Sequence, residues 1–99
     1  MPKLIVWSPS AEYDFAIILS YLNENWNEQV TNHFIDLTEG MLLQISNNPR
    51  QFPVIFKKER VRKCVLTKHN TLFYRVSTFQ IEILRVFDSR QDPKTLTLK

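Results

Sequence analysis

Apolar and polar residues in the first half of the chain recur with the spacing of a strand followed by two helices. Residues 3–7 form a short apolar run rich in β-branched side chains, which is typical of a strand. Apolar side chains then recur every three or four residues over residues 11–25, after a helix start at Ser8-Pro9-Ser10. The same spacing continues over residues 28–46, until Pro49 ends the pattern. This half therefore predicts a strand and an antiparallel pair of helices.

The second half changes to a period of two, which predicts strands. Residues 54–56 are predicted as a short strand, and residues 61–92 as three antiparallel strands. The breaks at His69-Asn70 and Thr78-Phe79 are long enough only for hairpin turns. The expected fold class is α+β: an N-terminal strand, an antiparallel two-helix hairpin, and an antiparallel β-meander with one face under the helices.

Two-residue turns at both breaks also predict the strand register. The predicted pairs are Tyr74 with Ile83 and Val65, Val76 with Ile81, and Arg75 with Glu82. Tyr74 would then lie on the face that the helices cover. The opposite face would carry Arg62, Cys64, Leu66, Lys68, Phe73, Arg75, Glu82, Leu84, Val86 and Asp88. A shift of one residue would exchange the two faces, so this assignment depends on the turns.

Length and composition restrict the possible classes of protein. The 99 residues suffice for one domain, residues 1–99, and 43% hydrophobic residues can supply its core. The single cysteine, Cys64, excludes a disulfide within the chain and suits a reducing cytoplasm. No run approaches the roughly 20 apolar residues of a membrane span, and the first apolar run is too short for a signal peptide.

Positive charge is concentrated just before the predicted meander. The formal net charge is +3, which favours anionic partners such as nucleic acid or an acidic protein segment. The densest basic run consists of Lys57, Lys58, Arg60, Arg62 and Lys63. We interpret this run as a docking surface for RNA or for an acidic partner segment, with a solvated hairpin tip as the alternative. Neither the histidines nor the cysteine have metal-ligand spacing and no glycine-rich loop occurs, so no metal or cofactor is expected.

Several short segments together resemble a known family. They are Trp7-Ser8, Ala11, Asp14, Tyr21, Pro49, Pro53, Val61-Arg62-Lys63, Phe73-Tyr74-Arg75-Val76 and Ile83-Leu84-Arg85-Val86-Phe87-Asp88. With these residues the chain resembles the RelE/ParE superfamily, the toxins of type II toxin–antitoxin modules once called plasmid stabilisation proteins. The resemblance covers nearly the whole chain. It implies a small bacterial toxin that is held inactive by an antitoxin whose extended or helical segment wraps around it.

The resemblance leaves two targets open, because RelE-type members cut messenger RNA on the ribosome and ParE-type members act on DNA gyrase. Cleavage of RNA needs a base, an acid and cations that stabilise the phosphate. Arg62, Arg75 and Arg90 are the candidate phosphate-binding residues and Asp88 is a candidate proton acceptor, although Arg75 paired with Glu82 would be structural.

The candidate acid is the weak point of the ribonuclease hypothesis. RelE-like ribonucleases typically carry a His or Tyr near the end of the last strand, where this chain has Asp88 and Arg90. An aspartate, with an ordinary pKa of about 3.9, is a poor acid at neutral pH. We therefore favour a ParE-like inhibitor of DNA gyrase. The alternatives are a RelE-like ribosome-dependent endonuclease and a non-toxic module that only binds its antitoxin.

Overall fold

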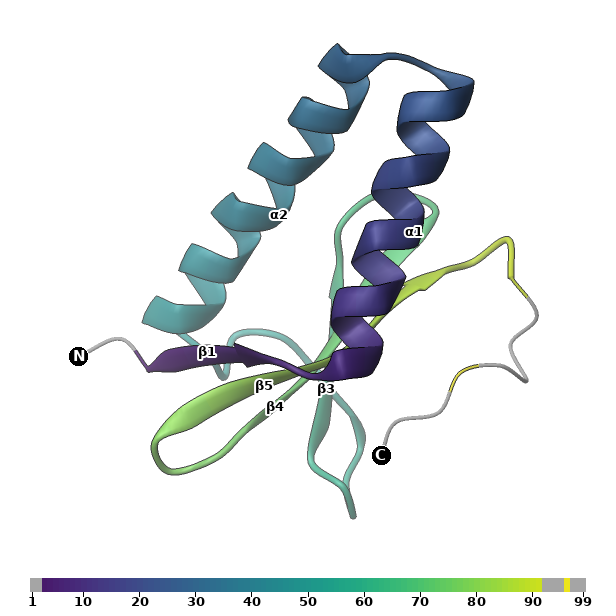
Figure 1. Cartoon of the computed structure of the whole chain (residues 1–99). Helices are drawn as coiled ribbons and strands as arrows, with labels where there is room; N and C mark the ends of the chain where they lie inside the picture. Colours follow the sequence, from purple (N-terminus) through teal and green to yellow (C-terminus); the bar gives the residue numbers. More distant parts are fainter. Residues whose placement is uncertain (1–2, 92–95, 97–99) are drawn as a thin grey trace.

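The computed structural model describes residues 3–91 and 96, and it contains each element that the sequence pattern predicts (Figure 1). The elements in chain order are β1 (Leu4–Trp7), α1 (Pro9–Asn25), α2 (Glu28–Asn47), β2 (Val54–Phe56), β3 (Val61–Val65), β4 (Asn70–Val76) and β5 (Gln80–Asp88). The α+β fold class is confirmed. In the described part of the chain, neither helix has the length and apolarity needed to cross a membrane.

Side-chain caps define where both helices begin. The hydroxyl oxygen of Ser8 accepts a hydrogen bond from the Ala11 N–H at 3.0 Å, and its O–H donates to the carbonyl of Leu84 at 2.8 Å. Ser8 therefore starts α1 and also fixes it to β5. The side-chain oxygen of Asn27 accepts from the Val30 N–H at 2.9 Å and starts α2 in the same way.

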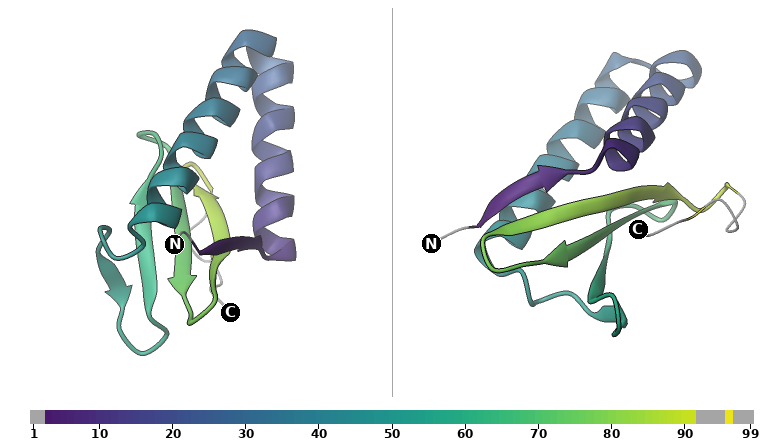
Figure 2. Two further views of the ribbon diagram at one scale, coloured as in Figure 1. Left: turned by 90° about the vertical axis from the view of Figure 1, so that its left-hand side faces the viewer. Right: turned by 60° about the horizontal axis from the view of Figure 1, so that its bottom comes forward.

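The sheet has five strands in the order β1-β5-β4-β3-β2. β1 pairs with β5 in parallel, whereas all other neighbours are antiparallel. β1 and β5, the first and last strands of the described residues, thus lie side by side, a pairing that the sequence pattern alone did not predict. Figure 2 shows both helices on one face of the sheet.

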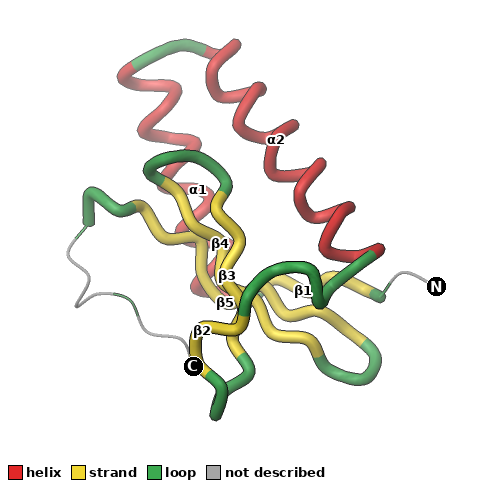
Figure 3. Tube along the Cα trace, turned by 180° about the vertical axis from the view of Figure 1, so that it is seen from behind, coloured by secondary structure: helices red, strands yellow, loops and turns green. Residues whose placement is uncertain are grey.

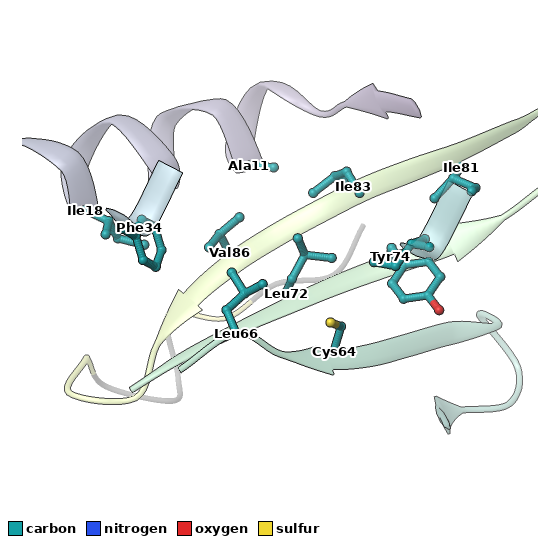
Figure 4. Packing of buried hydrophobic residues seen from close by; sticks show 11 residues of the cluster. Ala11, Ile18, Phe34, Cys64, Leu66, Leu72, Tyr74, Ile81, Ile83 and Val86 are labelled. Carbon is teal, nitrogen blue, oxygen red and sulfur yellow. The ribbon is translucent and has the colours of Figure 1, made fainter. Parts of the chain in front are cut away.

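Hydrophobic side chains pack on both faces of the sheet. The cluster under the helices contains Ala11, Ile18, Phe34, Ile45, Cys64, Leu66, Leu72, Tyr74, Ile81, Ile83 and Val86 (Figure 4). A second, smaller cluster contains Val61, Phe73, Leu84 and Phe87, with Ile55 and Leu96 packed against it. Because Phe73 alternates with Leu72 and Tyr74 along β4, this second cluster lies on the face opposite the helices.

The predicted register of β4 against β5 is confirmed at the hairpin. Tyr74 lies opposite Ile83, Val76 opposite Ile81 and Arg75 opposite Glu82. The turn is the predicted two-residue loop, closed by a hydrogen bond from the Ser77 N–H to the Gln80 carbonyl at 2.9 Å.

The predicted register of β3 against β4 is wrong, because the turn between them spans residues 66–69. The hydroxyl of Thr67 donates to Oδ1 of Asn70 at 2.7 Å and accepts from the N–H groups of His69 and Asn70, both at 3.1 Å. These bonds close the turn before the predicted position. Tyr74 consequently lies opposite Arg62, and Val65 lies opposite Thr71. Arg62, Cys64 and Leu66 therefore share the helix-covered face with Tyr74, and Lys68 lies in the turn.

The predicted face of the sheet is also wrong for Val86 and Asp88, because β5 contains a bulge. Tyr74 pairs with Ile83 but Phe73 pairs with Arg85, so Leu84 is an extra residue on β5. Beyond the bulge the faces are exchanged, and Val86 packs in the cluster under the helices rather than on the open face. Asp88 changes face with it, since it lies opposite Asn70, two residues before the core residue Leu72.

Arg85, the residue that follows the bulge, reaches α1, where Asp14 binds it through two hydrogen bonds. Oδ2 of Asp14 accepts from Nε of Arg85 at 2.6 Å, and Oδ1 accepts from Nη2 at 3.0 Å. Oδ2 also accepts from the N–H of Val86 at 3.1 Å. The side chains of Arg85 and Asp14 are only 12% and 9% exposed, and the hydrogen bond to Asp14 raises the pKa of Arg85. Asp14 thus accepts a hydrogen bond from a backbone N–H of β5 that lies beyond the residues paired with β1.

We expect the substitution Asp14→Asn to lower the free energy of unfolding by about 3 kcal/mol or more, because it leaves the charge of Arg85 buried without its counter-ion. Urea denaturation measures the change. The control is Glu82→Gln, which breaks the more exposed ion pair with Arg75 and should cost less than about 1 kcal/mol. Equal costs for the two variants would contradict the central role of Asp14.

Candidate functional site

A basic pocket of about 390 Å³ opens beside the hairpin formed by β2 and β3. Its lining residues are Arg50, Val54, Lys57, Arg60, Arg62 and Val76. Four of these six side chains are cationic and none is acidic, so the pocket is suited to an anionic group. Figure 3 shows the region from behind, with β2 following the loop that leaves α2.

Hydrogen bonds hold the loop between α2 and β2, which supplies Arg50, against the sheet. The phenol of Tyr74 donates to the carbonyl of Pro49 at 2.7 Å. Nη1 of Arg62 donates to the carbonyls of Phe52 at 2.6 Å and Arg50 at 3.2 Å. Arg62 therefore has a structural role as well as contributing positive charge to the pocket.

Ring packing supports the same loop. The Phe52 ring meets the Tyr74 ring edge to face, with their centroids 6.4 Å apart and the planes at 88°. The loop that carries Arg50 is thus fixed by both polar and apolar contacts. The wall of the pocket is preorganised before any ligand binds.

Arg60 lines the pocket from a strained backbone position. Its φ is 59°, and no other non-glycine residue in the described ranges has a positive φ. Its N–H donates to the carbonyl of Lys57 at 3.2 Å, which closes the turn between β2 and β3. A left-handed conformation at a non-glycine residue costs roughly 1 kcal/mol or more, and such strain often occurs at functional sites.

The structure brings together only some of the basic residues predicted from the sequence. Lys57, Arg60 and Arg62 line the pocket, whereas Lys58 and Lys63 do not. Lys63 lies opposite Phe73 and points to the other face of the sheet. Sequence reasoning missed Arg50, because it lies outside the basic run and only the folded loop brings it to the pocket.

The three arginines proposed for RNA cleavage lie apart and are engaged in different interactions. Arg75 pairs with Glu82 at 3.5 Å on the face opposite the helices. Arg90 lies beyond the end of β5, pairs with Asp88 at 2.6 Å and stacks on the ring of Tyr21, with its guanidinium carbon 4.9 Å from the centroid. Arg62 belongs to the pocket described above. The arrangement does not direct the three cations at one phosphate.

The titratable groups around these arginines have shifted pKa values. Hydrogen bonds from Arg90 lower the pKa of Asp88, and the nearby charge of His69 contributes to the same shift. Burial raises the pKa of Tyr74 to about 12, partly offset by the charge of Arg62, and burial raises the pKa of Cys64 to about 11. No group of three or more His, Cys, Asp or Glu side chains within residues 3–91 and 96 could hold a metal ion.

A strand, a helical hairpin and an antiparallel meander form the fold of RelE/ParE-type toxins of type II toxin–antitoxin modules. Residues 5–93 match the model of a family described as the ParE toxin of the type II toxin–antitoxin system parDE. The chain therefore belongs to the ParE toxin family. No curated protein sequence matches the chain.

Solved structures of toxin–antitoxin systems have the same fold. A chain of the chromosomal ParDE system from P. aeruginosa has a TM-score of 0.66 and 16% identity, covering 87% of this chain and 95% of that chain. A chain of the DinJ–YafQ complex from E. coli has a TM-score of 0.60 and 12% identity, with coverages of 91% and 96%. A chain of the RelBE2 complex from Mycobacterium tuberculosis has a TM-score of 0.57 and 15% identity, with coverages of 89% and 99%.

We expect Tyr74→Phe to destabilise the protein by about 1 kcal/mol at pH 7, because the Pro49 carbonyl loses its donor. The penalty should shrink at high pH. Folding raises the pKa of Tyr74 from 10.0 to about 12, so the stabilisation is complete below pH 10 and is lost as the pH rises towards 12. Urea denaturation at pH 8 and pH 11 measures both effects. A penalty independent of pH would contradict the raised pKa.

Proposed function

We propose that the protein is a growth-inhibiting cytoplasmic toxin that acts on DNA gyrase by protein contact, and that a cognate antitoxin neutralises it. Membership of the ParE family and the likeness to a ParDE system support this proposal. The single observation that carries the choice of target is the state of Asp88. The carboxylate at the end of the last strand is held ionised by Arg90, so it cannot serve as a general acid.

Tyr74, which lies opposite Arg62 on the neighbouring strand, is equally unsuited to proton transfer at neutral pH. Tyr74 has a pKa of about 12 and donates its proton to the carbonyl of Pro49. Efficient general acids and bases have pKa values near the working pH. The three arginines proposed for cleavage, Arg62, Arg75 and Arg90, are also engaged in separate interactions and do not converge on one phosphate. Both features favour an inhibitor over a ribonuclease.

A RelE-like ribosome-dependent endonuclease is the second candidate, and the surroundings of Asp88 are the observation in its favour. Arg90 lies against Tyr21, with its Nη1 3.4 Å from the phenol oxygen. His69 is close by, since its carbonyl accepts a hydrogen bond from the Ser89 N–H at 2.7 Å and its charge affects Asp88. A histidine here would supply the missing acid or base.

The experiment that separates the candidates is induced expression of the chain without antitoxin. A gyrase inhibitor should arrest growth and induce the DNA-damage response while messenger RNA stays intact in primer extension. The purified protein should also inhibit supercoiling by gyrase. The variant His69→Ala should keep both effects.

Discrete cleavage inside translated codons would overturn the gyrase proposal, and loss of that cleavage in His69→Ala would establish the second candidate. Absence of growth arrest from folded protein would exclude both and leave a module that only binds its antitoxin. Circular dichroism of the purified wild-type chain and of the His69→Ala variant checks that each protein is folded.

A further inference from the structure

We propose that two copies of the chain associate through the outer edge of β1, with the two β1 strands antiparallel about a two-fold axis at Val6. The two sheets then form one continuous sheet, in which β1 of one copy lies beside β1 of the other. The proposed function does not use this interface, so the inference holds or fails independently of the gyrase target.

The first argument is that β1 has a free edge. Within the described residues it is the outermost strand of the sheet and pairs only with β5 (Figure 2). The Ser8 N–H donates to the Ile83 carbonyl at 2.9 Å, and successive residues of a strand direct their backbone groups to opposite sides. The N–H and C=O groups of Ile5 and Trp7 therefore point away from β5. No hydrogen bond from another described residue reaches them.

The second argument is that this edge specifies one register. The outward carbonyl of Lys3 accepts a hydrogen bond from the Ser46 hydroxyl at 3.0 Å, so the free groups of the edge are those of Ile5 and Trp7. An antiparallel copy satisfies all of them when Ile5 of each chain lies opposite Trp7 of the other. Val6 then lies on the two-fold axis, directly opposite Val6 of the other copy.

The third argument is the apolar surface along the same edge. Leu4 and Val6 are 67% and 37% exposed, and Phe79, next to the residue that pairs with Leu4, is 85% exposed. Edge strands of monomers are usually protected by charged residues, proline or a bulge. A groove of about 660 Å³ also lies beside β1, and its lining residues apart from Glu12 are apolar: Ile5, Val6, Trp7, Phe15 and Ala16. The edge therefore has the character of a contact surface.

The fourth argument is charge complementarity, which favours a second copy over a different partner. Lys3 precedes β1 and Glu12 lies in the first turn of α1, and neither forms an ion pair within the described residues. The Lys3 ammonium donates to the Ser77 carbonyl at 2.6 Å and has further N–H donors. In the proposed register Lys3 lies opposite Pro9 of the other copy, where α1 of that copy begins. The two-fold axis thus brings Lys3 towards Glu12 at both ends of the interface.

The first test measures the mass of the purified full chain by sedimentation equilibrium, at concentrations up to about 1 mM. The edge is short, so we expect a monomer–dimer equilibrium with a Kd between about 1 and 100 μM. Val6→Lys should raise this Kd by about tenfold or more, because it places like charges directly opposite each other. The control Val65→Lys adds the same charge at a valine of β3 that is 53% exposed, and it should change the Kd by less than about threefold.

A charge exchange tests the ion pairs. Lys3→Glu and Glu12→Lys should each raise the Kd by about threefold or more, because each places like charges together at both ends of the interface. The double variant restores opposite charges and should return the Kd to within about twofold of the wild-type value. Circular dichroism checks that each variant is folded.

Cysteine cross-linking tests the register. Val6→Cys should form a disulfide-linked dimer when oxidised glutathione is added, because opposite residues without mutual hydrogen bonds have Cα atoms about 4.5 Å apart in antiparallel strands. Leu4→Cys is at the more exposed position but lies opposite Ser8 of the other copy, so it should remain unlinked. The native Cys64 is buried and does not compete.

A folded wild-type chain that stays monomeric at about 1 mM would overturn the proposal and leave the edge of β1 to a strand from a different protein. Equal weakening by Val6→Lys and Val65→Lys would overturn it as well, because the contact would then lie elsewhere on the molecule. Equal cross-linking of Val6→Cys and Leu4→Cys would contradict the two-fold axis at Val6.

Discussion

The ion pair between Asp14 and Arg85 connects α1 to β5 across 71 residues of sequence, and the relative position of helices and sheet depends on it. The carboxylate is almost fully removed from water, yet it accepts hydrogen bonds from Arg85 and from the backbone of Val86. Such a group stabilises a fold only when every partner is in place. Arg85 and Val86, the two residues that Asp14 binds, directly follow the bulge at Leu84, so this contact between the two layers adjoins a local irregularity of one strand.

The same sheet positions the basic pocket at its other end. Tyr74 is in the middle of β4, fully buried, and its phenol reaches the loop that carries Arg50. Opposite it on β3, Arg62 binds the same loop. The side chains of Tyr74 and Arg62 therefore connect the sheet under the helices to the loop that carries Arg50. Each of them combines an apolar ring or stem with a polar end.

The order of the elements could be predicted because the spacing of hydrophobic residues and the helix caps are local signals. The register of β4 against β5 could be predicted from the short turn at Thr78-Phe79. The β3–β4 register could not, since the Thr67 side chain competes with the backbone to define an earlier turn. A bulge adds one residue without a sequence signature of its own, which moved Val86 and Asp88 to the other face. Arg50 joins the pocket only through tertiary contacts, so no pattern along the chain could reveal it.

The parallel pairing of β1 with β5 also has a consequence for synthesis of the protein. Leu4 to Trp7 are made first, but their partners are Gln80 to Ile83. A nascent chain on the ribosome cannot acquire the native strand order until residues 80–83 have been translated, and the pairing of β1 with β5 joins the most distant segments of the sheet. A chain with this topology cannot complete its native sheet before β5 has been made.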